Sequence, residues 1–165
     1  MLTVTFAGDQ LTLKDEQLKV GDKLPALSLS LPNLASFSTS ETSGLRVFLT
    51  VPSLDTPVCD LEARTFNQKA GELPGVSIFV VSVDLPFAQA RWCGQAGIDA
   101  VRTLSDYNGA EFGRATGTFI AELALLTRAV FIVDADDTVV YAEYVPEVTN
   151  APDYDTVYAK LAELM

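Results

Sequence analysis

The sequence predicts an α/β fold in which a mixed β-sheet is flanked by helices and preceded by an N-terminal β-hairpin. Residues 45–51 and 76–83 form two nearly continuous apolar runs rich in Val, Ile and Phe, as expected of strands covered on both faces. Segments with helical spacing follow both runs. We therefore expect the two strands to be parallel and joined by a right-handed crossover.

The N-terminal hairpin is predicted from the alternation of apolar and polar residues, a pattern that buries one face of a strand. Residues 3–6 and 10–14 alternate in this way on either side of the turn sequence Ala7-Gly8-Asp9. Residues 26–31 repeat the alternation and predict a further strand before the first apolar run.

The helix between the two apolar runs is predicted to begin at Thr56 and Pro57. Threonine can cap a helix by accepting a hydrogen bond from a first-turn amide, and proline fits the first helical position. An apolar stripe at helical spacing is expected to face the core. The stripe comprises Val58, Leu61, Thr65 and Phe66, whereas the charged residues Asp60, Glu62, Arg64 and Lys69 fall outside it.

The C-terminal part of the chain completes the predicted sheet. Pro86 opens a second helix that extends to residue 96. Residues 129–134 and 138–145 predict two antiparallel strands joined by an acidic turn, and residues 152–165 predict a closing amphipathic helix. This order of elements is compatible with a thioredoxin-like core.

Composition excludes several classes of function. The chain has 165 residues, 11 Lys plus Arg, 22 Asp plus Glu and no histidine, which gives a formal net charge of −11. About 100–200 residues is usual for one domain, so we expect a single domain over residues 1–165. Without histidine, no Ser-His-Asp or Cys-His relay is available. The negative charge argues against nucleic acid or an anionic membrane as a partner, and we attribute it to solubility.

No targeting or membrane-spanning segment is evident. The N-terminus lacks a basic stretch and reaches Asp9 before a long apolar run forms, and no run approaches the roughly 18 apolar residues that span a bilayer. We therefore expect the protein in the cytoplasm. Structural disulfides do not normally persist there, and a pair of cysteines is more often redox-active.

Cys59 lies in the predicted first turn of the helix that follows the first apolar run. Free amides and the helix dipole at that position favour thiolate over thiol, as a nucleophile requires. The acidic neighbours Asp55, Asp60 and Glu62 disfavour a thiolate, so a cation would have to come from elsewhere. Arg128, directly before a buried run, is the candidate. The alternative is that Cys59 is a small apolar residue packed on a helix.

Cys93, the second cysteine, lies between Trp92 and Gly94 in the second predicted helix, where packing against the core is the simpler role. The spacing of the two cysteines fits neither a CxxC redox motif nor a zinc site. A disulfide requires Cα atoms within about 7 Å, which no sequence spacing establishes.

Two segments carry a family resemblance. The stretch Pro52-Ser53-Leu54-Asp55-Thr56-Pro57-Val58-Cys59 resembles the active-site pattern of peroxiredoxins, in which Pro is followed after three residues by Thr and after two more by Cys. Residues 82–93, with the sequence SVDLPFAQARWC, resemble the hallmark segment of the bacterial thiol peroxidases, the atypical two-cysteine peroxiredoxins. The hairpin and the closing helix fit the same subfamily, so the resemblance covers essentially the whole chain.

The resemblance implies a role for each of five residues. Cys59 would be the peroxidatic cysteine and Cys93 the resolving cysteine, with Pro52, Thr56 and Arg128 around the reacting sulfur. A threonine hydroxyl can accept one hydrogen bond and donate another, and so align sulfur and peroxide. A guanidinium supplies fixed N–H donors to the thiolate and to the leaving oxygen. A proline has no N–H, so it shapes the pocket and keeps it dry.

The implied reaction is attack of the Cys59 thiolate on the O–O bond of a hydroperoxide, which gives a sulfenic acid and releases water or an alcohol. Cys93 then condenses with the sulfenic acid, and an external dithiol, thioredoxin by resemblance, reduces the disulfide. No metal, flavin or haem cofactor is required. The resemblance also implies a homodimer and a preference for bulky alkyl or lipid hydroperoxides.

Two other functions compete with the peroxidase. One is a thiol-disulfide exchange protein that uses the same cysteines without peroxide, and the other is a non-catalytic thioredoxin-like binding domain with packed cysteines. Thr56 and Arg128 favour the peroxidase, because disulfide exchange needs no hydroxyl to align a peroxide. Two features depart from the subfamily pattern: Pro57 follows Thr56, and residues 117–128 look shorter and more apolar.

Overall fold

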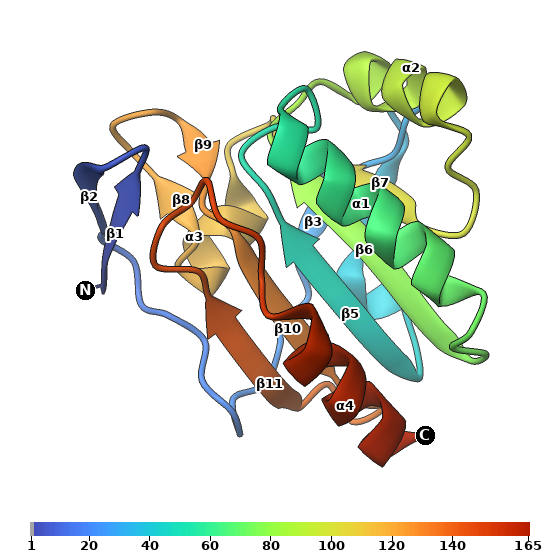
Figure 1. Cartoon of the computed structure of the whole chain (residues 1–165). Coiled ribbons are helices and arrows are strands. Elements are labelled where there is room, and N and C mark those ends of the chain that lie inside the picture. Colours follow the sequence, from blue (N-terminus) through green and yellow to red (C-terminus); the bar gives the residue numbers. More distant parts are fainter. Residues whose placement is uncertain (1) are drawn as a thin grey trace.

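The computed structural model describes residues 2–165, and its centre is a seven-stranded sheet with helices on both faces (Figure 1). The strand order is β11-β10-β5-β6-β7-β3-β4. The parallel strands β5, β6 and β7 span Leu45–Thr50, Val76–Ser82 and Arg102–Ser105. β10 (Ala129–Val133) is antiparallel to both β5 and β11 (Val139–Tyr144). The predicted mixed sheet and its antiparallel final strands are confirmed.

The other elements surround this sheet. The predicted hairpin is confirmed as β1 (Leu2–Phe6) and β2 (Asp9–Leu13). The described helices are α1 (Pro57–Ala70), α2 (Pro86–Ala96), α3 (Glu111–Thr116), α4 (Tyr154–Leu164) and the 3-10 helix η1 (Thr39–Glu41). The short strands are β3 (Ser28–Ser30), β4 (Ser36–Ser38), β8 (Phe119–Ile120) and β9 (Leu125–Leu126). Among residues 2–165, no helix has the length and apolar character needed to cross a bilayer.

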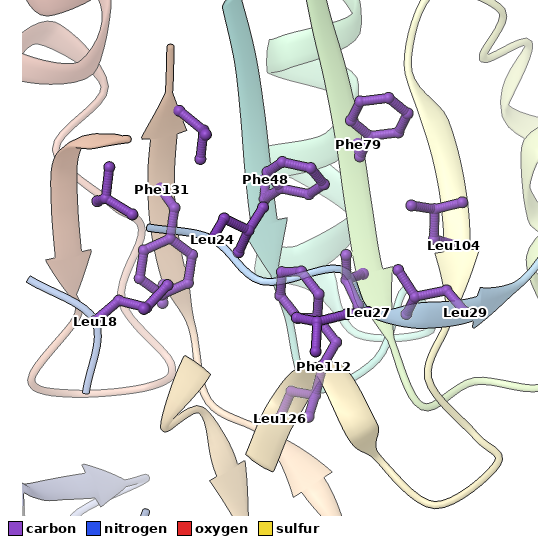
Figure 2. Packing of buried hydrophobic residues seen from close by; sticks show 14 of the residues in the cluster. Leu18, Leu24, Leu27, Leu29, Phe48, Phe79, Leu104, Phe112, Leu126 and Phe131 are labelled. Atoms are coloured by element: carbon purple, nitrogen blue, oxygen red, sulfur yellow. The ribbon is translucent and has the colours of Figure 1, made fainter. Parts of the chain in front are cut away.

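Successive side chains of the central strands enter two different hydrophobic clusters, because strand side chains alternate between the faces of a sheet. On β5, Val47 and Leu49 pack with residues of α1 and α4. Phe48 points to the opposite face, where it stacks on Phe79 and meets Phe112 of α3 (Figure 2). Both faces of β5 are therefore buried, which explains its nearly continuous apolar sequence.

Helix α1 buries a different face from the predicted stripe. Phe66 is buried as predicted, but Leu61 is 58% exposed. The buried face instead comprises Cys59, Glu62, Ala63 and Phe66. The prediction was wrong because it placed the Glu62 charge outside the buried face, whereas this carboxylate pairs with the buried Arg128.

The start of α1 also departs from the predicted capping. Thr56 occupies the N-cap position with extended backbone angles, and Pro57 is the first helical residue, as predicted. The Thr56 hydroxyl makes no capping hydrogen bond; it donates instead to the Ser53 carbonyl at 2.9 Å. Its proton is thus directed back into the loop before the helix.

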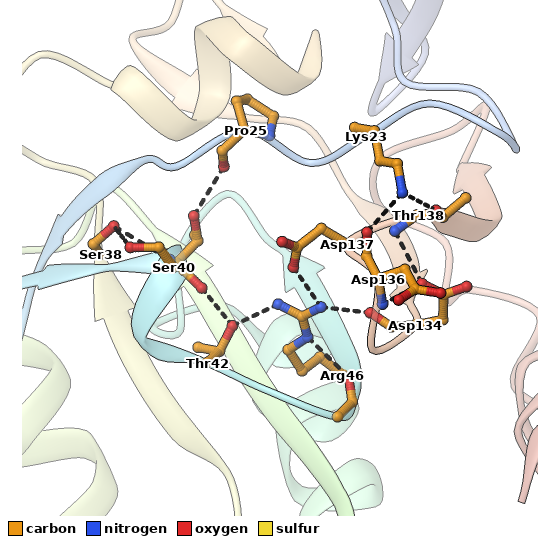
Figure 3. A network of polar contacts seen from close by, with 12 residues as sticks. Lys23, Pro25, Ser38, Ser40, Thr42, Arg46, Asp134, Asp136, Asp137 and Thr138 are labelled. Carbon is orange, nitrogen blue, oxygen red and sulfur yellow. Dashed lines mark hydrogen bonds and ion pairs between the residues drawn. The ribbon is translucent and has the colours of Figure 1, made fainter.

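Arg46, a second buried arginine, lies near the start of β5 and binds the turn between β10 and β11 (Figure 3). Its Nη2 donates to the Asp134 carbonyl at 2.5 Å and to Asp137 Oδ1 at 2.7 Å, while Nη1 donates to Thr42 Oγ1 at 2.8 Å. Its Nε donates to the Gly44 carbonyl at 3.1 Å. The acidic turn between β10 and β11 is therefore tied to the first residues of β5.

The buried face of α1 seen in the structure predicts that two substitutions on this helix lower the free energy of unfolding by different amounts. Phe66 contacts Tyr154 and Tyr158 of α4, with ring centroids 5.7 and 5.5 Å away. We expect Phe66→Ala to lower the free energy of unfolding by about 3–5 kcal/mol. Leu61→Ala, the matched control, should change it by less than about 0.5 kcal/mol. Urea denaturation of both variants measures this, and a large cost at Leu61 would contradict the assigned face.

Candidate active site

Cys59 lies at the carboxyl end of β5, in the first turn of α1, and is completely buried. The antiparallel register of β10 on β5 pairs Ala129 with Thr50. Arg128, the preceding residue, is therefore held beside the point where β5 ends and the loop to α1 begins. The topology brings together two residues that are far apart in the sequence.

Arg128 makes three contacts in this buried site. Its Nη2 donates to Cys59 Sγ at 3.2 Å. Its Nη1 lies 2.7 Å from Glu62 Oε1, an ion pair with almost no solvent exposure, and its Nε donates to the Val148 carbonyl at 2.8 Å. The predicted contact between Arg128 and the Cys59 sulfur is present.

The charges of this cluster depend on one another. Burial raises the pKa of the Glu62 carboxyl to about 7, although Arg128 acts in the opposite direction. Burial alone would lower the pKa of the Arg128 guanidinium, but Glu62 and Cys59 outweigh it and raise that pKa. Arg128 therefore stays protonated, and it offers a fixed positive charge to the sulfur.

The loop before α1 supplies the other two predicted residues of the site. Pro52 is buried two residues after the end of β5, and Thr56 is partly exposed three residues before Cys59. Because the Thr56 hydroxyl donates to the Ser53 carbonyl, its oxygen is left with lone pairs to accept a hydrogen bond.

Cys93 is on a different helix, α2, and is partly buried. Its Sγ donates to Thr103 Oγ1 of β7 at 3.8 Å. Burial raises the pKa of the Cys93 thiol, and the hydrogen bond to Thr103 partly offsets that effect. Cys59 and Cys93 are both free thiols in this structure.

Two of the acidic neighbours of Cys59 have partners of their own in the structure. Glu62 is the partner of Arg128, and Asp60 is bound by Arg64 and by the Trp92 indole. The role of Glu62 was missed, although its spacing of three residues from Cys59 places both on one helix face.

Asp84, just before α2, was also missed. Its carboxylate accepts hydrogen bonds from Ser53 Oγ at 2.7 Å and the Leu54 amide at 2.9 Å, and so binds the loop before α1. Ser82 Oγ donates to the same carboxylate at 2.7 Å. The segment that leads to Cys93 is thereby attached to the loop that leads to Cys59.

Known proteins with similar sequences span nearly the full chain. The Redoxin family profile matches residues 19–158. A thiol peroxidase of Clostridium acetobutylicum is 52% identical over 156 residues, which cover 94% of this chain and 95% of that protein. A thiol peroxidase of Bacillus subtilis is 46% identical over 156 residues, 94% of this chain and 93% of that protein.

Solved structures agree with these sequence comparisons. A peroxiredoxin-like protein from Aquifex aeolicus has a TM-score of 0.91 at 40% identity, covering 99% of this chain and 97% of that one. A thiol peroxidase from Chromobacterium violaceum also has a TM-score of 0.91, at 23% identity, with coverage of 98% and 96%, and supports the fold. The thioredoxin-like fold and the family resemblance are confirmed: the chain belongs to the Redoxin family and, within it, to the thiol peroxidases.

Proposed function

We propose that this peroxidase reduces hydroperoxides through a sulfenic acid on Cys59. The thiolate attacks one oxygen of the O–O bond, the sulfur is oxidised to sulfenic acid, and the other oxygen takes a proton and leaves as water or an alcohol. The observation that carries the proposal is the 3.2 Å contact between Arg128 Nη2 and Cys59 Sγ inside a dry site. A buried guanidinium stabilises negative charge far better than one in water.

Thr56 is proposed to align the peroxide. Its hydroxyl proton is engaged by the Ser53 carbonyl, so its oxygen can accept the O–H of an incoming hydroperoxide. Pro52 closes the pocket without adding a competing N–H donor. The Cys59 side chain has no solvent exposure, so a peroxide reaches the sulfur only when neighbouring side chains move aside.

Cys93 is proposed to resolve the sulfenic acid as an intramolecular disulfide, which a thiol reductant then reduces. We propose thioredoxin as that reductant, and a single catalytic domain over residues 1–165 that works as a homodimer in the cytoplasm. Support for a protein contact surface comes from Leu85 and Phe87, which are 53% and 63% exposed at the start of α2.

Peroxide consumption with a thioredoxin and reductase recycling system tests the proposal. Wild-type protein should turn over, Cys59→Ser should be inactive, and Cys93→Ser should react once and stop at a sulfenic acid detectable by mass spectrometry. The peroxidase assignment fails if the wild type consumes no peroxide, or if Cys59→Ser keeps full activity. Disulfide exchange without peroxide consumption would instead identify a thiol-disulfide exchange protein.

The Arg128 contact predicts that two substitutions move the titration of the Cys59 thiol in opposite directions. Both are made in a Cys93→Ser background, where Cys59 is the remaining thiol. Arg128→Met should move the Cys59 titration to higher pH, because the thiolate loses its cation. Glu62→Gln should move it to lower pH, because Arg128 then has the sulfur as its only anionic partner. Ultraviolet thiolate absorbance follows both curves. Unchanged titration in Arg128→Met would remove Arg128 from this role.

The acceptor role of Thr56 predicts a difference between two further variants. Thr56→Ser keeps a hydroxyl and should react with hydroperoxide at close to the wild-type rate. Thr56→Val has a similar shape but no hydroxyl, and should be slower by about a hundredfold in kcat/KM. Equal rates for the two variants would show that the hydroxyl does not align the substrate.

A further inference from the structure

Helix α2, which carries Cys93, has little packing to hold it in place. Only Pro86 and Gln89 among its residues are buried. Gly94 lies inside the helix, where glycine costs roughly 1 kcal/mol relative to alanine. Pockets of about 480 and 360 Å³, both lined by Trp92, lie between α2 and the start of α1. Specific polar contacts therefore contribute more to holding α2 folded and in place than they would for a helix packed on the core.

One such group of contacts joins α2 to α1. The Trp92 Nε1 donates to Asp60 Oδ1 at 2.7 Å. Arg64 Nε donates to both oxygens of the same carboxylate, at 3.1 and 3.0 Å, and Arg64 Nη1 reaches the Ala96 carbonyl at 3.4 Å. The Arg64 guanidinium also lies 5.9 Å from the centre of the indole ring. We call these four residues the Asp60–Trp92 clamp.

The clamp sits immediately beside both cysteines in the sequence. Asp60 directly follows Cys59, and Trp92 directly precedes Cys93. The two thiols are nevertheless engaged elsewhere, because the Cys59 sulfur faces Arg128 and the Cys93 sulfur faces Thr103. With the clamp closed, both cysteines are held in their helices as separate thiols.

Two other contacts fasten the ends of the α2 segment. Asp84 binds the loop before α1, and Asn67 Oδ1 of α1 accepts hydrogen bonds from the Ala100 and Val101 amides at 2.8 and 3.1 Å. The chain between these anchors can unwind without detaching. From Ala100 back to Cys93, an extended chain would reach up to about 23 Å. Unwinding α2 therefore lets Cys93 move while the ends of the segment stay attached to α1 and to the loop before it.

We propose that the Asp60–Trp92 clamp controls the rate of disulfide formation, since it must open before Cys93 can reach Cys59. This inference rests on the proposed function. In the open state the Cys93 thiol attacks the Cys59 sulfenic sulfur; an S–S bond forms, the S–O bond breaks, and the hydroxyl leaves as water with the thiol proton. Asp60 and Trp92 are positioning residues, and neither contacts the reacting atoms.

Single-turnover oxidation with one equivalent of hydrogen peroxide, followed by rapid quenching and mass spectrometry, separates sulfenic acid formation from disulfide formation. Trp92→Phe removes the indole N–H, and Asp60→Ala removes its acceptor. Both should speed disulfide formation by about three- to tenfold, because opening the clamp then no longer requires one weak charged hydrogen bond to break. Asp60→Asn retains an acceptor oxygen and should fall between Asp60→Ala and the wild type.

Glu72→Gln is the matched control. It removes an acidic side chain of the loop directly after α1, which pairs with Lys69 at 3.4 Å, and it should leave the rate of disulfide formation unchanged. The clamp proposal is overturned if sulfenic acid forms normally but disulfide formation is unchanged or slower in both Trp92→Phe and Asp60→Ala. Acceleration in Glu72→Gln to the same extent would also overturn it.

Hydrogen exchange of the reduced protein tests the clamp without peroxide chemistry. Amides of α2 should exchange about three- to tenfold faster in Trp92→Phe and Asp60→Ala than in the wild type, and unchanged exchange would contradict the clamp. Because Trp92 is the single tryptophan, its fluorescence in the wild type should change in step with disulfide formation. If the wild type forms no sulfenic acid, the proposed function fails, whereas the exchange measurement still decides whether the clamp holds α2.

Discussion

The contact between Arg128 and Cys59 is the interaction on which the site depends. A buried guanidinium is costly unless its donors are satisfied, and here helix α1 supplies two acceptors and the segment after β11 supplies the third. Helix α1 turns an acidic residue, Glu62, inward to meet it, and the segment after β11 presents the Val148 carbonyl. The remaining donor faces the sulfur. The orientation of α1 and the register of β10 on β5 are both consistent with this requirement.

The two buried arginines, Arg46 and Arg128, differ in the atoms that accept their hydrogen bonds. Both side chains are almost completely buried, and they lie near opposite ends of β5. Arg46 is surrounded by oxygen acceptors alone, two carbonyls, a hydroxyl and a carboxylate, and fixes a turn. Arg128 has a sulfur among its acceptors, an atom that can change its charge and its oxidation state.

Local patterns predicted much of this fold, and packing decided the rest. The long strands β5, β6 and β10 follow from their apolar runs, and helices α1 and α2 from prolines at their first positions. Short elements such as β4, α3 and the β8–β9 pair carry too few residues for a periodic signal. The five candidate site residues were predicted from the resemblance to the motifs of a known family. The inward position of Glu62 could not be predicted from hydropathy, because it is the buried Arg128, just before β10, that makes this position favourable.

The assembly of the site has a consequence for the newly made chain. Cys59 is synthesised early, whereas Arg128 and the Val148 carbonyl come from the last quarter of the sequence. Until those residues are in place, the sulfur has no buried guanidinium beside it. Under the proposed function, the chain therefore acquires its reactive sulfur only when nearly all of it has folded, and the emerging polypeptide would be less open to oxidation at Cys59 than the finished protein.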